Sequence, residues 1–251
     1  MDDLWKITFR VHRYKTGCKP YYQDFTLEIS PDEYVLDGIE KIWAFHDRSL
    51  VYRHACHHST CGACGMRVNN REKLTCITRI QDVTRNGGRI LVEPLRNMPG
   101  ISDLAVDMGQ FFRIMAEIDY NQVQPVNQQP NNKGIKPAFL DEGEGMERLV
   151  DCLECGLCIS ACPVSATSTA YMGPAALATV QAKTHYLDAK AWMAVDNQDG
   201  LWRCHSAFEC TEVCPSNFEP GWRIMELRRL TLAAKIKLLL RNGVQKEAGN
   251  G

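Results

Sequence analysis

Cysteine is the residue type in this sequence whose spacing could support chemistry. The chain of 251 residues holds twelve cysteines, and eleven of them fall into three runs. Closely spaced thiols bind metals, or pair as disulfides in short secreted chains. This chain is long, and its start, Met1 to Trp5, is acidic and unlike a secretion signal. We therefore expect reduced thiols that serve as metal ligands.

The first run has the spacing by which plant-type ferredoxins hold a [2Fe-2S] cluster. Its ligands would be Cys56, Cys61, Cys64 and Cys76. Gly62 and Gly65 lie beside them, where backbone N-H groups could approach the cluster sulfurs. A zinc site is the alternative, but zinc modules usually pair two C-x2-C units. His57 and His58 suggest a Rieske centre, in which two histidines replace two cysteine ligands. We reject this interpretation because four cysteines already complete the ligand set.

The second and third runs follow the pattern of two-cluster bacterial ferredoxins. They are Cys152-x2-Cys155-x2-Cys158-x3-Cys162-Pro163 and Cys204-x5-Cys210-x3-Cys214-Pro215. In such proteins the last cysteine of each run serves the other cluster. This rule predicts a [4Fe-4S] site formed by Cys152, Cys155, Cys158 and Cys214. The remaining cysteines, Cys162, Cys204 and Cys210, would hold a third centre.

The third centre lacks one ligand. A complete run would carry a cysteine midway between Cys204 and Cys210, where the sequence has Ala207. A cubane corner without a thiolate readily loses its iron, so we expect a [3Fe-4S] cluster. The twelfth cysteine, Cys18, lies in a turn away from every run, and we interpret it as a bystander.

The elements that must position the first run resemble a small sheet around one helix. Apolar residues alternate over 5–11 and 25–29, which predicts two half-buried strands. Ser30, Pro31 and Glu33 match a cap, a first helical proline and a capping-box acid, so a helix should start there. We expect short strands out to about Pro94 and a plant-type ferredoxin (β-grasp) domain over residues 1–106.

The second half should be mainly helical. Met108, Phe111, Phe112 and Met115 have helical spacing, and the later cysteines lie among helix-forming stretches. Residues 121–137 are rich in Asn, Gln and Pro and predict a loop or strap. The expected fold class is α+β, with a helical, bacterial-type ferredoxin domain over residues 107–251.

Charge and hydropathy exclude other classes. A formal net charge of -1 argues against a nucleic-acid binder. The sequence contains no run of eighteen apolar residues, so it predicts no membrane-spanning helix. The last stretch, 223–246, mixes basic and apolar residues, which fits either a helix lying on a membrane or partner or a solvated helix with one core-facing stripe.

The complete arrangement resembles the iron-sulfur subunit of succinate dehydrogenase and fumarate reductase. Besides the cysteines, the resemblance includes Asp103–Met108, Gly173-Pro174-Ala175 and Cys204-His205-Ser206. It implies an electron-transfer subunit of a succinate:quinone oxidoreductase that carries [2Fe-2S], [4Fe-4S] and [3Fe-4S] clusters. Its implied partners are an FAD-containing flavoprotein, membrane anchor subunits with or without haem b, and quinone. The implied location is peripheral, at the cytoplasmic face of a prokaryotic cell membrane.

The resemblance also implies a quinone contact at His205. Family members that use ubiquinone add a Trp shortly after the Cys-Pro, but here Pro163 is followed by Val164-Ser165-Ala166-Thr167-Ser168-Thr169. This difference hints at another quinone or membrane subunit. His205 as a structural residue near the cluster is the alternative.

Several alternatives stay open at this point. Fumarate reductase, working in the opposite direction, shares these motifs. Other two-electron oxidoreductases, of the glycolate oxidase or heterodisulfide type, usually have two full cubane runs, against which Ala207 argues. A free ferredoxin-like carrier would generally be shorter and more acidic. A zinc-stabilised module would be colourless.

Overall fold

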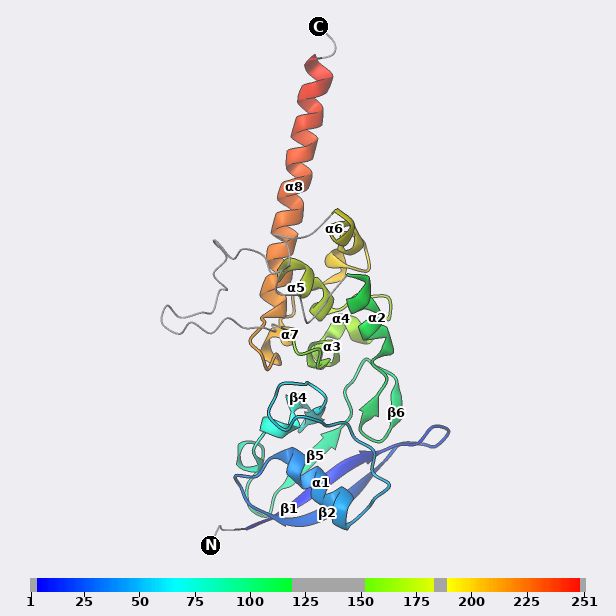
Figure 1. Ribbon diagram of the computed structural model, residues 1–251, viewed down its shortest axis with the longest axis vertical. Helices are drawn as coiled ribbons and strands as arrows, with labels where there is room; N and C mark the ends of the chain where they lie inside the picture. Colours follow the sequence, from blue (N-terminus) through cyan, green and yellow to red (C-terminus); the bar gives the residue numbers. More distant parts are fainter. Residues whose placement is uncertain (1–3, 119–151, 183–188, 249–251) are drawn as a thin grey trace, which may run out of the picture.

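The structure is a computed structural model that describes residues 4–118, 152–182 and 189–248. Figure 1 shows a sheet and one helix at the N-terminal end and a group of short helices above them. The C-terminal helix extends away from both. The α+β class and the order of the two parts are as the sequence predicts.

The N-terminal part is a β-grasp-like sheet of five strands in the order β2-β1-β5-β3-β4. β1 pairs antiparallel with β2 and parallel with β5. Ile7, Phe9 and Val11 alternate into the core, where they meet Ile39 and Ile42 of the helix. The elements are β1 (Trp5–Arg13), β2 (Tyr21–Ile29), α1 (Val35–Phe45), β3 (Gly65–Val68), β4 (Arg71–Leu74) and β5 (Arg89–Glu93).

The predicted start of the first helix is wrong. Ser30 and Glu33 do make the expected box contact, since Ser30 N-H donates to Glu33 Oε2 at 2.9 Å, but they close a turn. Tyr34 is still extended (φ -94°, ψ 159°) and forms a bridge to Arg79, so α1 begins only at Val35. Asp37 then accepts the Tyr34 N-H at 2.9 Å. Pairing with a distant segment thus delays the helix beyond the local signal.

The C-terminal part is mainly helical, as predicted. A small hairpin leads into it, and the segment around Phe111 and Met115 forms the expected helix. The elements are β6 (Gly100–Ser102), β7 (Ala105–Val106), α2 (Gly109–Glu117), α3 (Leu157–Ala161), α4 (Pro163–Thr167), α5 (Pro174–Ala182), α6 (Ala189–Val195), α7 (Glu209–Glu212) and α8 (Pro220–Ala248). The loop expected over 121–137 lies outside the described residues.

One apolar cluster joins the two parts of the chain. Cys64, Cys76 and Leu95 from the N-terminal part are buried together with Leu157 and Phe111. A boundary between residues 106 and 107 stays a prediction, because this shared core extends to both sides of it.

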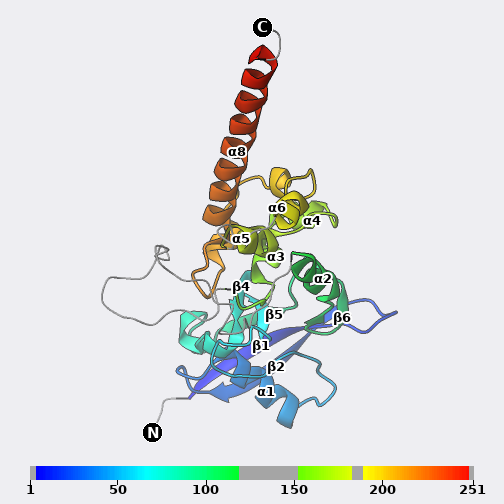
Figure 2. The same cartoon turned by 45° about the horizontal axis from the view of Figure 1, so that its top comes forward.

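The C-terminal helix packs into the core at its beginning, and further along Lys235 pairs with Asp196 at 2.7 Å. Ile224, Leu227 and Thr231 are fully buried, and α8 packs against α5. From Leu232 onward the described side chains are exposed, and Figure 2 shows this end of α8 standing clear of the other elements. Among the residues that the structure describes, no helix has both the length and the apolar character needed to cross a bilayer.

Candidate iron-sulfur centres

The first cysteine set lies on the loop between α1 and β3 and on the short 3-10 turn Thr75–Ile77 after β4. Cys56 Sγ accepts backbone N-H groups from Thr60 at 3.3 Å and Cys61 at 3.4 Å. Cys76 Sγ accepts one from Ser59 at 3.4 Å. Amide donors of this kind stabilise thiolates that ligate iron.

The backbone of this loop is bent to present those amides. His57, Ser59 and Gly62 have φ values of 61°, 59° and 69°, in the left-handed region. Partial burial raises the pKa of Cys56, but N-H groups from the loop outweigh burial and lower that pKa to about 5. The loop therefore favours a thiolate at Cys56.

The second set lines one apolar cavity, although its members come from two distant segments. These cysteines are Cys152, Cys155, Cys158 and Cys214. Burial raises the pKa of Cys155 to about 12 and holds that of Cys158 well above its ordinary value, and neighbouring sulfurs add to both shifts. Four thiolates packed this closely need a cationic centre to offset their charge and lost hydration, so the donor set fits an iron cluster.

The third set lines a second cavity with Ala207, His205 and Tyr171. Its cysteines are Cys162, Cys204 and Cys210. Ser206 N-H donates to Cys204 Sγ at 3.4 Å, and Ser206 and Phe208 on either side of Ala207 have φ of 57° and 61°. The short loop thus presents a methyl group where a fourth ligand would stand.

Tyr171 places a buried donor at this cavity. Its hydroxyl lies close to Cys204 but makes no well-formed hydrogen bond to any residue that the structure describes. Burial, followed by the negative charge of Cys204 and Cys162, raises its pKa. An unpartnered buried hydroxyl beside three sulfurs fits a cavity that holds a sulfur-rich group. No sequence motif marks this residue, so sequence reasoning missed it.

The first two sets are in direct contact through glycines. A Cβ on Gly62 would lie 2.6 Å from the Leu153 carbonyl oxygen and 2.8 Å from Cys155 Cβ. A Cβ on Gly65 would lie 3.1 Å from the Cys155 carbonyl oxygen. Besides their predicted role toward the cluster, these glycines therefore let the second cysteine loop approach the first.

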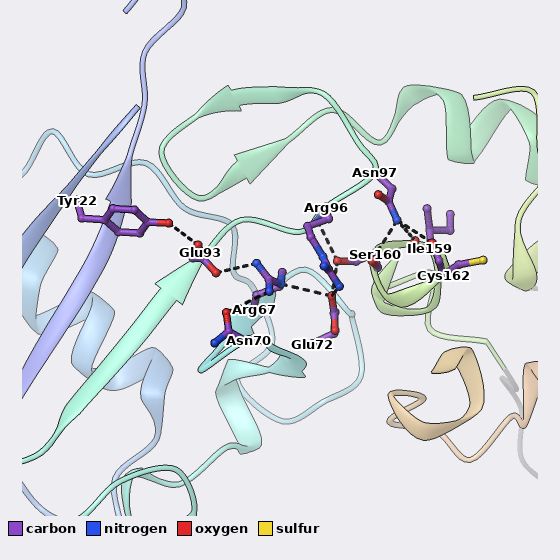
Figure 3. Close-up of polar contacts among 10 residues, drawn as sticks. All are labelled: Tyr22, Arg67, Asn70, Glu72, Glu93, Arg96, Asn97, Ile159, Ser160 and Cys162. Carbon is purple, nitrogen blue, oxygen red and sulfur yellow. Dashed lines mark hydrogen bonds and ion pairs between the residues drawn. The ribbon is translucent and has the colours of Figure 1, made fainter. Parts of the chain in front are cut away.

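A buried polar cluster centred on Glu72 and Ser160 holds this contact in place (Figure 3). Ser160 of α3 donates to Glu72 Oε1 at 2.8 Å and accepts the Arg96 N-H at 2.9 Å. The side chains of Arg96 and Arg67 also approach Glu72 Oε1, at 3.3 and 3.5 Å. Glu72 is only 7% exposed. The helix between Cys158 and Cys162 is thereby tied to the sheet.

Asn97 adds a second tie to the same helix. Its Nδ2 donates to the carbonyl oxygens of Ile159 at 2.8 Å, Ser160 at 3.1 Å and Cys162 at 3.1 Å (Figure 3). These oxygens lie at and just beyond the C-terminal end of α3, and two of them also accept backbone N-H groups, Ile159 from Cys162 at 3.2 Å and Cys162 from Ala166 at 3.3 Å. The position of Cys162 therefore depends on the N-terminal part of the chain.

All twelve cysteines are free thiols, and Cys18 is exposed in its turn, away from the three sets. His205 is exposed at the rim of the third cavity. Trp222, which sequence reasoning did not single out, is 60% exposed and packs on Phe208 of the same rim, with ring centroids 4.7 Å apart.

Comparison with known proteins agrees with this arrangement. A family described as "2Fe-2S iron-sulfur cluster binding domain" matches residues 8–113, and one described as "4Fe-4S dicluster domain" matches residues 148–218. The chain is 31% identical to the fumarate reductase iron-sulfur subunit of Mycobacterium tuberculosis, over 94% of this chain and 96% of that protein. The chain belongs to the family of succinate dehydrogenase and fumarate reductase iron-sulfur subunits.

Further relatives support this membership. The Haemophilus influenzae fumarate reductase iron-sulfur subunit is 30% identical, over 81% of this chain and 83% of that protein. A chain of the Mycobacterium smegmatis Sdh1 complex in the apo form has the same fold, with a TM-score of 0.72 at 24% identity and coverage of 93% and 98%. This iron-sulfur electron-transfer subunit therefore has a 2Fe-2S domain and a 4Fe-4S dicluster domain.

Proposed function

We propose that this subunit relays electrons between an FAD-containing flavoprotein and membrane quinone in a succinate:quinone oxidoreductase. The proposed ligands are Cys56, Cys61, Cys64 and Cys76 for [2Fe-2S], Cys152, Cys155, Cys158 and Cys214 for [4Fe-4S], and Cys162, Cys204 and Cys210 for [3Fe-4S]. When bound, such clusters accept and donate single electrons. Membrane anchor subunits would hold the complex at the cytoplasmic face of the membrane.

The observation that carries the proposal is the serial contact of the three cysteine sets. Cys155 of the second set lies against Gly62 of the first loop. Helix α3, which carries Cys158 of the second set, packs against α7, which carries Cys210 of the third. The protein thus holds the sets in the order first, second, third, which favours stepwise transfer over short distances.

A three-iron third centre is part of this proposal. The matched dicluster family describes two 4Fe-4S sites, whereas Ala207 gives the third cavity of this chain only three cysteines. The chemistry of the donor set therefore supports [3Fe-4S] there.

We also propose His205 as a contact to the quinone. It is exposed at the third cavity, beside Cys204, where a partner and its ligand could reach it. His205→Ala should lower succinate:quinone activity while leaving succinate oxidation by an artificial acceptor nearly intact. An equal loss in both assays would instead favour a structural role.

Fumarate reductase is the second candidate, because the two curated relatives above carry that name. The assembled complex should be purified with its native flavoprotein and anchor. Succinate-dependent quinone reduction is then compared with quinol-dependent fumarate reduction at matched substrate concentrations. Faster quinone reduction supports the proposed direction, and faster fumarate reduction supports the second candidate.

A further inference from the structure

Three metal-ligating side chains meet on the surface beside the first cysteine loop, outside the cysteine sets. They are Glu40 of α1, His54 and His57. His54 Nδ1 and His57 Nε2 each lie 3.2 Å from the same oxygen, Glu40 Oε1. The two nitrogens lie 3.3 Å from one another. The three ligand atoms therefore form a nearly equilateral triangle.

The size of this triangle matches a metal ion. Zinc binds imidazole nitrogen and carboxylate oxygen at about 2.0–2.2 Å, which places neighbouring tetrahedral ligands about 3.3–3.4 Å apart. We propose that Glu40, His54 and His57 form a divalent transition-metal site of the two-histidine, one-carboxylate type, with solvent in the remaining position. Imidazole ligands favour Zn²⁺ and related first-row ions over Mg²⁺ and Ca²⁺.

The surrounding structure holds the ligands in place before any ion binds. Tyr52 stacks on His54, with centroids 5.0 Å apart and planes at 21°. His57 is fixed by a left-handed backbone, φ 61°, in the bent loop. Glu40 projects from a helix whose opposite face is buried against the sheet. A site built on such restrained groups loses little entropy on binding.

An ion can reach this site from solvent, because the three side chains are 30–43% exposed. It would link α1 to the cysteine loop, with a positive charge one residue from Cys56. The alternative is a purely hydrogen-bonded arrangement in which both rings donate to one carboxylate oxygen. A metal site would retain zinc through the nitrogen and oxygen atoms of these three side chains. A purely hydrogen-bonded cluster would not.

The test uses the full chain in its complex, purified anaerobically with its iron in place and dialysed against Zn²⁺. We expect one zinc per chain with unchanged iron. The zinc absorption-edge fine structure should show only nitrogen and oxygen neighbours at about 2.0–2.2 Å, with no sulfur at about 2.3 Å. Glu40→Gln and His54→Asn should each weaken zinc binding about tenfold or more.

His58→Asn is the matched control, because it removes an exposed imidazole from the same loop but outside the triangle. This variant should retain the zinc. Two further readouts, iron and acid-labile sulfide, show whether a variant keeps its clusters, and either of the two ligand variants suffices if the other fails to assemble. The proposal is overturned if wild type binds no zinc, binds it through sulfur, or keeps it after both ligand substitutions.

Discussion

At the scale of single residues, Ala207 decides the third centre. Ala207→Cys adds a thiolate at the lip of the cavity that Cys162, Cys204 and Cys210 line. The centre should then keep a fourth iron and become [4Fe-4S], so that iron rises from about nine to about ten per chain. The electron paramagnetic resonance signal of an oxidised [3Fe-4S] centre should disappear in the variant.

Ala207→Ser is the control for this change, because it adds a polar atom of similar size without a thiolate. It should keep the three-iron signal. An oxidised, intact wild type without that signal, or with about ten irons per chain, would contradict the proposed third centre. The converted centre should also have a lower reduction potential, and quinone reduction should slow.

Tyr171 should tune the same centre through its hydroxyl. The group is buried at the cavity, close to Cys204, and makes no well-formed hydrogen bond to the described residues. A donor aimed at a sulfur-rich group stabilises its reduced, more negative form. Tyr171→Phe should therefore lower the reduction potential of the third centre in a redox titration, whereas Tyr21→Phe, an exposed tyrosine on β2, should not. An unchanged potential in Tyr171→Phe would show that the hydroxyl does not influence the third centre.

The cysteine grouping could be predicted at this scale because thiol spacing encodes cluster type. The two cavities bring together the second and third sets that the spacing assigns, although their role as ligands stays a prediction. Tyr171, Glu40 and His54 could not be found in this way. Their chemistry depends on neighbours that are distant in the sequence.

At the scale of elements, the glycines of the first loop set how closely the two cysteine loops approach. Gly62 and Gly87 both have left-handed φ, 69° and 76°, but only Gly62 has a neighbour within 4 Å of a Cβ. Alanine at either position costs about 1–2 kcal/mol of backbone strain. Gly62→Ala must in addition displace Leu153 and Cys155, so its melting temperature should fall well below that of Gly87→Ala.

Electron transfer gives the second readout of this comparison. Displacing Cys155 should lengthen the step between the first two centres and slow their equilibration in rapid reduction experiments, and Gly87→Ala should leave it at the wild-type rate. Equal melting temperatures and rates for the two variants would mean that the contact between the two cysteine loops accommodates the added methyl group without loss of stability.

Periodicity predicted the elements themselves well, since alternation and helical spacing directly reflect which face is buried. The start of α1 failed because Tyr34 pairs with Arg79, a contact between segments far apart in the sequence. The polar cluster centred on Glu72 and Ser160 could not be predicted for the same reason. Local signals do not report how two domains dock.

At the scale of the whole molecule, the shared core couples the two parts unequally. Cys64 and Cys76 are 2% and 3% exposed and pack with Leu157 of the helical part. Cys56 is only partly buried and is outside that cluster. Substitutions within one ligand set should therefore differ in how far they disturb the rest of the protein, although each removes one sulfur.

Cys56→Ser should remove or perturb the [2Fe-2S] signal and leave the signals of the other two centres intact, because the change does not touch the shared core. Cys76→Ser should remove the same signal, and in addition it places a hydroxyl among apolar side chains, at a cost of about 1–3 kcal/mol if unpaired. Its melting temperature should fall below that of Cys56→Ser. Cys18→Ser, an exposed thiol outside every set, should match wild type in signals and melting. Loss of all three centres in Cys56→Ser would contradict separate ligand sets, because a substitution outside the shared core would then be unfolding the helical part as well.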